Sequence, residues 1–69
     1  MRYLAVLEPT ATGYSAYLPD LPGCVAAGET EGETLDLLRR AVALHLDGMR
    51  DDGEAVPPPR AEGHILEVA

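Results

Sequence analysis

The alternation of apolar and polar residues predicts three short strands ahead of one long helix. Residues 2–8 are expected to form the first strand, residues 14–18 the second and residues 24–27 the third. The segment between the first two is short and rich in turn-forming residues, so these strands should be antiparallel neighbours. Apolar side chains fall on both faces of the first strand, which indicates a central strand or one covered by a second subunit.

The helix has the best-specified start in the chain. Thr30 suits an N-cap and Glu33 stands three residues later, the capping-box spacing in which side chains satisfy the free amides of the first turn. Gly53 is placed to end the helix in a left-handed conformation. Apolar residues recur at three- and four-residue intervals, which predicts a face that packs on the sheet. The main positions of this face are Leu35, Leu38, Val42, Leu46 and Met49, and Leu37, Ala41 and Leu44 widen it. On the opposite side of the helix, Asp36 and Arg40 are spaced to form an ion pair.

Beyond the helix, three consecutive prolines at 57–59 predict a stiff extended spacer, and residues 64–68 are long enough for a fourth strand. The expected fold is therefore α+β, a three- to four-stranded mainly antiparallel sheet with one long helix on one face, in the order strand, strand, strand, helix, strand. We expect residues 1–69 to form one domain without a carboxy-terminal DNA-binding domain.

Charge narrows the kinds of partner. Twelve acidic residues oppose five basic ones in 69 residues, a net charge of −7. Because basic side chains dominate phosphate recognition, direct nucleic-acid binding is not expected, whereas a basic protein partner fits; acidity that merely keeps a small protein in solution is the alternative. No segment has the length and apolarity of a membrane helix, and a single cysteine indicates a reducing compartment, so a cytoplasmic location is predicted.

The residues that carry chemistry do not form a recognisable catalytic or metal-binding pattern. Cys24, His45 and His64 lack the local spacing of metal ligands, so no metal is predicted. Cys24 is expected in the core, His45 half-buried at the edge of the helix's apolar face, and His64 in solvent. An acid-based nuclease would need acids such as Glu8, Asp20 and Glu67 to meet in space, which is a less favoured alternative. Neither catalysis nor a cofactor is expected.

A binding surface is the remaining candidate. Four carboxylates occupy eight residues at the start of the helix. Asp20, which lies between two prolines in the turn that follows the second predicted strand, is expected beside them. Capping and solubility would require only two of these acids. The alternative is an acidic patch that meets basic side chains of a partner, formed by Asp20, Glu29, Glu31, Glu33 and Asp36.

One motif gives the chain a family resemblance. Tyr17-Leu-Pro-Asp-Leu-Pro-Gly-Cys24 places two rigid prolines, Pro19 and Pro22, around Asp20, and Gly23 follows them. With the helix and its Asp51-Asp-Gly-Glu54 end, this order resembles the amino-terminal domain of HicB-like antitoxins over most of the chain. The matching motif residues are expected to shape the corner: Tyr17, Pro19, Asp20, Pro22, Gly23 and Cys24.

The resemblance implies a truncated ribonuclease H-type fold without that enzyme's catalytic acids. It also implies a role as an antitoxin that binds a small basic HicA-type, RNA-cleaving toxin and neutralises it by occlusion. The thin core of so small a domain favours a homodimer. The alternative is an orphan homo-oligomeric scaffold or small-ligand sensor without a toxin partner.

Overall fold

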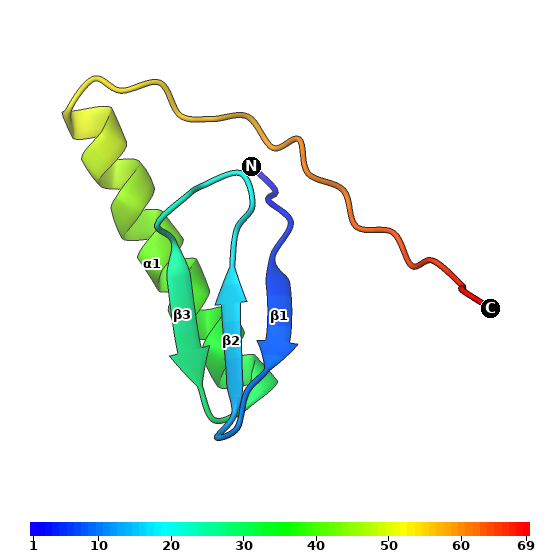
Figure 1. Cartoon of the computed structure of the whole chain (residues 1–69). Helices are drawn as coiled ribbons and strands as arrows, with labels where there is room; N and C mark the ends of the chain where they lie inside the picture. Colours follow the sequence, from blue (N-terminus) through cyan, green and yellow to red (C-terminus); the bar gives the residue numbers. More distant parts are fainter.

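A computed structural model describes all residues from 1 to 69. Three strands, β1 (Val6–Pro9), β2 (Tyr14–Tyr17) and β3 (Val25–Gly28), form one antiparallel sheet in the order β1-β2-β3. A single helix, α1 (Glu31–Asp51), packs on one face of this sheet, mainly across β3 and β2 (Figure 1). The predicted α+β architecture is confirmed.

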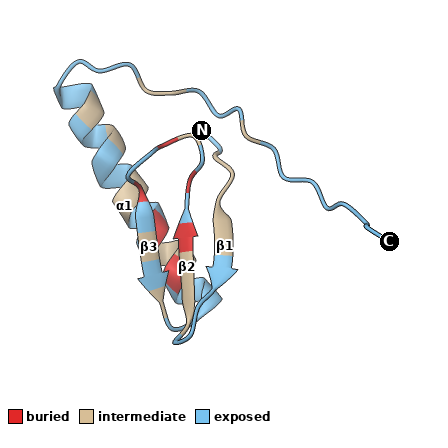
Figure 2. Cartoon of the chain, viewed as in Figure 1, coloured by how far each residue is buried: buried red, intermediate tan, exposed pale blue.

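Small residues in the centre of the sheet let the helix approach closely. Leu7, Ala16 and Ala26 are directly opposite one another on the three strands and point toward α1. Ala16 is only 2% exposed, and Leu38 of the helix is 3% exposed. The fully buried residues gather where β2, the corner after it and the helix meet (Figure 2). With six buried residues in 69, this core is thin for a domain that folds alone.

Both helix ends form as the sequence predicts. The Thr30 side-chain oxygen accepts a hydrogen bond from the Glu33 N–H at 3.1 Å, while the Glu33 carboxylate accepts one from the Glu29 N–H at 3.3 Å. At the other end Gly53 has φ +72° and its N–H donates to the Arg50 carbonyl at 3.1 Å. The N–H of the next residue donates to the carbonyl five residues back, which completes a Schellman cap.

The apolar face of the helix is narrower than predicted. Its five main positions pack on the core as expected. Leu44, however, is 74% exposed, and His45 is exposed although a half-buried position was predicted. A three-stranded sheet is too small to cover more than one stripe of a 21-residue helix, so residues at the margin of the stripe face solvent.

The two ends of the chain depart from the predicted strands. β1 begins at Val6, opposite Tyr17, because the chain turns away after Tyr17 into Pro19, which has no N–H to donate. Residues 1–5 therefore belong to no strand. Residues 64–68, predicted as a fourth strand, are extended but pair with nothing, and they leave the sheet toward the carboxy terminus (Figure 1).

Candidate partner-binding surface

The corner between β2 and β3 closes one end of the core. Two successive turns form this corner. The Leu21 N–H donates to the Leu18 carbonyl and the Cys24 N–H donates to the Leu21 carbonyl, both at 3.2 Å. The turns direct the side chains of Leu18, Leu21 and Cys24 inward. Leu21 is 1% exposed and Cys24 3% exposed. Gly23 has φ +92°, a conformation that favours glycine. Leu21 is the most buried side chain of this corner, which the two turns and Gly23 hold in shape.

Pro19 and Pro22 flank Leu21 and are themselves exposed. Each fixes its own φ and carries no N–H that would need a partner in solvent. They hold the corner in shape without filling the core.

Asp20 in the same corner binds a distant part of the chain. One of its carboxylate oxygens accepts hydrogen bonds from the backbone N–H groups of Arg60, at 2.9 Å, and Ala61, at 3.0 Å. The Ala61 hydrogen bond, followed by that of Arg60, lowers the pKa of Asp20 below its ordinary value. The structure thus gives this acid a tethering role that no local pattern indicated.

The prediction that Asp20 lies beside the acids at the start of the helix is wrong. The corner adjoins the end of the sheet where Tyr17 pairs with Val25, whereas the helix begins beyond the opposite end, where Tyr14 pairs with Gly28. The length of β3, about 3.3 Å per residue, separates these ends. Asp20 is therefore not part of one patch with the helix-start acids.

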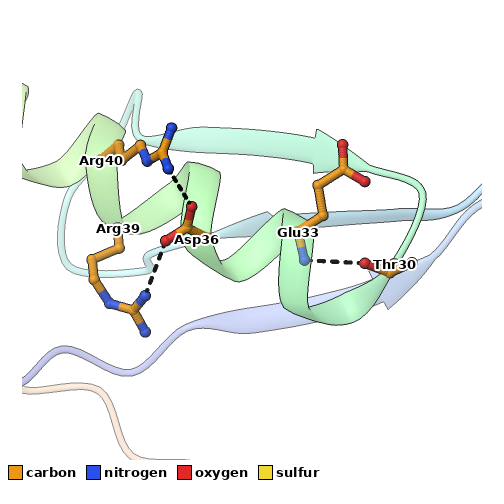
Figure 3. Close-up of polar contacts among 5 residues, drawn as sticks. All are labelled: Thr30, Glu33, Asp36, Arg39 and Arg40. Carbon is orange, nitrogen blue, oxygen red and sulfur yellow. Dashed lines mark hydrogen bonds and ion pairs between the residues drawn. The ribbon is translucent and has the colours of Figure 1, made fainter.

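Two of the four acids at the helix start are already engaged. Asp36 pairs with Arg40 at 2.9 Å and with Arg39 at 3.5 Å, and Glu33 belongs to the capping arrangement around Thr30 (Figure 3). Glu29 and Glu31 are exposed, and their carboxylates have no ion pair or hydrogen bond. Among the four acids, only Glu29 and Glu31 therefore have carboxylates without an ion pair or a hydrogen bond, and Glu33 has no cationic partner.

The sheet face that the helix leaves open carries an apolar row that sequence reasoning did not single out. Val6, Tyr17 and Val25 are directly opposite one another, and alternation places them on the side away from α1. Tyr17 is 40% exposed and Val25 67% exposed. The alternation of side chains along each strand already placed Val6, Tyr17 and Val25 on one face of its own strand. Their alignment into a row follows only from the order and register of the three strands.

The remaining chemistry-bearing groups lie apart. Burial raises the pKa of the Cys24 thiol, which disfavours the reactive thiolate. His45 is exposed on the helix, and His64 lies in solvent beside Glu62, with 3.3 Å between the ring nitrogen and the carboxylate. No three of the His, Cys, Asp and Glu side chains are grouped so as to hold a metal ion. The helix is not apolar enough to cross a lipid bilayer.

The fold and the corner can be compared with known proteins. Residues 3–67 match the family model of the HicB-like antitoxin of bacterial toxin–antitoxin systems. An uncharacterised 14.9 kDa protein of Haemophilus phage HP1 is 37% identical over 83% of the chain, and the antitoxin HicB of Escherichia coli K12 is 31% identical over 99% of it. The chain spans about half of these relatives, 43% and 52% of their lengths respectively.

A relative of similar size and a solved structure also match. The UPF0150 protein Ta0767 of Thermoplasma acidophilum is 29% identical, and the match covers 90% of this chain and 91% of that protein. A chain of the solved HicA3 and HicB3 toxin–antitoxin complex superposes with a TM-score of 0.72 at 30% identity, over 86% of this chain and 70% of that one. The family model and the relatives agree, and the chain belongs to the HicB-like antitoxin family.

Proposed function

We propose that this chain is the toxin-binding module of an antitoxin, which neutralises a small basic HicA-type RNA-cleaving toxin by covering its active surface. The observation that carries the proposal is the match, over 86% of the chain, to a protein solved in the HicA3 and HicB3 toxin–antitoxin complex. Occlusion requires a shaped surface and no reacting group, so the proposal includes neither catalysis nor a cofactor. It places the pair in the cytoplasm, where RNA is the toxin's substrate.

Electrostatic attraction brings the partners together in this proposal. A net charge of −7 produces a field that raises the association rate with a basic protein. Glu29 and Glu31 add two unpaired carboxylates close to each other at the amino end of α1. Complementary charge acts mainly on association rate and orientation.

The apolar row of the open sheet face supplies the buried contact. Interface cores are enriched in aromatic residues. Tyr17 offers a large aromatic ring for burial, while its hydroxyl can hydrogen-bond to water at the edge of the interface. Val6 and Val25 flank it on the neighbouring strands. The proposed toxin surface is therefore this row, with the helix-start acids guiding approach.

Charge reversal tests the electrostatic part. Glu29→Lys with Glu31→Lys should lower the association rate with the toxin by about 10- to 100-fold at low salt, and the deficit should shrink as salt screens the charges. The measurement is stopped-flow or surface plasmon resonance kinetics with a small basic HicA-type toxin.

Asp51→Lys with Glu54→Lys is the matched control. It makes the same change in net charge at the other, exposed end of the helix. Equal deficits in the two variants, or a deficit that salt leaves unchanged, would remove Glu29 and Glu31 from the interface.

A further inference from the structure

The open sheet face, on the side away from α1, carries one charged strand residue, Glu8. Because Leu7, Ala16 and Ala26 point toward the helix, alternation places their strand neighbours on the open face. These neighbours form two rows, the apolar row Val6, Tyr17 and Val25 and a second row of Glu8, Ser15 and Ala27. Glu8 is exposed, and its carboxylate has no ion pair or hydrogen bond within the chain.

The second row is lower than the apolar row beside it. Ser15 and Ala27, here named the shelf, are small, whereas Tyr17 has a large ring that is 40% exposed. Glu8 is directly opposite Ser15, and Tyr17 stands two residues along β2 from Ser15. Glu8 and Tyr17 are therefore diagonal neighbours, about 7–8 Å apart, a separation within reach of long and aromatic side chains. An aromatic ring borders the shelf on one side and a carboxylate borders it at one end.

A toxin that covers the apolar row must also deal with the charge of Glu8. The shelf lies between that row and the sheet end at Gly28, after which Glu29 follows. Both neighbours belong to the proposed toxin surface, so contact with them covers Glu8 as well. A carboxylate that loses water without gaining a positive partner is strongly unfavourable. The partner must therefore bring a cationic side chain to this position.

The shape of the shelf favours an arginine over a lysine. A guanidinium group is planar, stacks on an aromatic ring and presents a fork of N–H donors that matches a carboxylate. A further N–H of the same group can donate to the Ser15 hydroxyl, while the methylene stem lies over Ala27. The ammonium group of a lysine has no plane to stack on Tyr17, so it would use only the carboxylate fully.

We propose that the shelf receives an arginine side chain of the toxin, whose guanidinium stacks on Tyr17 and donates hydrogen bonds to the Glu8 carboxylate. The inference rests on the proposed function, because the arginine belongs to the protein that covers the open face. It gives Glu8 a different role from Glu29 and Glu31, which guide approach. A charge pair that is covered in the complex acts mainly on the dissociation rate. The pair also selects among toxins, since one without a cation at this position leaves Glu8 unpaired.

Glu8→Gln tests the carboxylate in surface plasmon resonance kinetics with a small basic HicA-type toxin. The substitution keeps the size of the side chain and removes its charge. It should raise the dissociation rate by about 10- to 100-fold and change the association rate much less. Glu54→Gln is the matched control, because it removes one exposed carboxylate at the other end of the helix and should leave the dissociation rate within about twofold of the wild type.

Graded fluorination tests the aromatic ring. Tyr17→Phe keeps the ring, and phenylalanine analogues with one, two or three fluorine atoms at this position keep its shape while they weaken its negative face. The dissociation rate should rise with each fluorine, which a purely packing role of the ring would not produce. In the double variant Glu8→Gln with Tyr17→Leu, the combined effect should be smaller than the product of the single effects, because both remove contacts of the same guanidinium.

The outcomes separate this inference from the proposed function. A tight wild-type complex that Glu8→Gln leaves unchanged, or a dissociation rate that does not respond to fluorination, would overturn the arginine site while the toxin-binding role stands. Absence of a wild-type complex would overturn both. Glu8 and Tyr17 are exposed, and circular dichroism of each variant checks that the domain stays folded.

Discussion

Leu21→Ala tests whether the corner motif works by anchoring the core. Leu21 is 1% exposed and is held inward by two turns that start and end at Leu18 and Cys24. The substitution leaves Pro19, Pro22 and Gly23, and therefore the rigid frame of the corner, unchanged. Its effect isolates the anchor from the frame.

The expected loss is large relative to what holds the domain together. Removing three buried carbons costs about 2.4 kcal/mol at roughly 0.8 kcal/mol for each, and the cavity that remains raises the total to about 2–5 kcal/mol. A chain of 69 residues has a total stability of roughly 3.5–10 kcal/mol at typical values per residue. One side chain thus accounts for a major part of the folding free energy.

Urea unfolding followed by circular dichroism measures this loss, with both variants and the wild type at the same protein concentration. Labelling of the Cys24 thiol gives a second readout, since this side chain is 3% exposed and reacts only when the core opens. Leu44→Ala is the control at an exposed position and should change the free energy of unfolding by less than about 0.5 kcal/mol. A loss below about 1 kcal/mol for Leu21→Ala, or equal losses in both variants, would refute the anchoring role.

Three further predictions concern the helix and the tether. Gly48→Ala should stabilise the chain by about 0.5–1 kcal/mol in thermal unfolding, because the new methyl group in the helix meets open space. Gly13→Ala, in the turn between β1 and β2, should destabilise the chain because its Cβ would clash with the Gly28 carbonyl oxygen. The reverse order of stabilities would contradict both expectations. Thr30→Ala should cost about 1 kcal/mol in urea unfolding through loss of the N-cap, and no loss would contradict the observed cap. Because the folded pKa of Asp20 is lowered, its tether contributes fully above the unfolded pKa near 4 and is lost as pH falls through the folded value. Protection of the amides of residues 60–61, measured against their intrinsic exchange rate at the same pH, should fall there and in Asp20→Ala at neutral pH, and unchanged protection would contradict the tether.

Local signals in the sequence were sufficient for the helix. The cap at Thr30 and the termination at Gly53 depend on contacts within a few residues, which composition and spacing reveal. The corner was predictable for the same reason, since Pro19, Pro22 and Gly23 constrain the backbone wherever they stand. The resemblance to the HicB-like family rested on this corner and is confirmed.

Features that depend on contacts across the fold were missed. Asp20 bonds to N–H groups 40 and 41 residues away, which no periodicity encodes. Its separation from Glu29 and Glu31 follows from the register of β2 and β3, which a linear reading does not give. The predicted strand at residues 64–68 has the apolar content of a strand but no neighbour within the chain, so its structure depends on what it contacts.

The central claim is that this chain neutralises a small basic RNA-cleaving protein by covering it. The most direct measurement is co-expression with a small basic HicA-type toxin, followed by co-purification and an RNA-cleavage assay of that toxin with and without this chain. The account predicts a tight complex in which RNA cleavage is suppressed. Failure to form a complex, or cleavage that continues in the presence of excess chain, would contradict it.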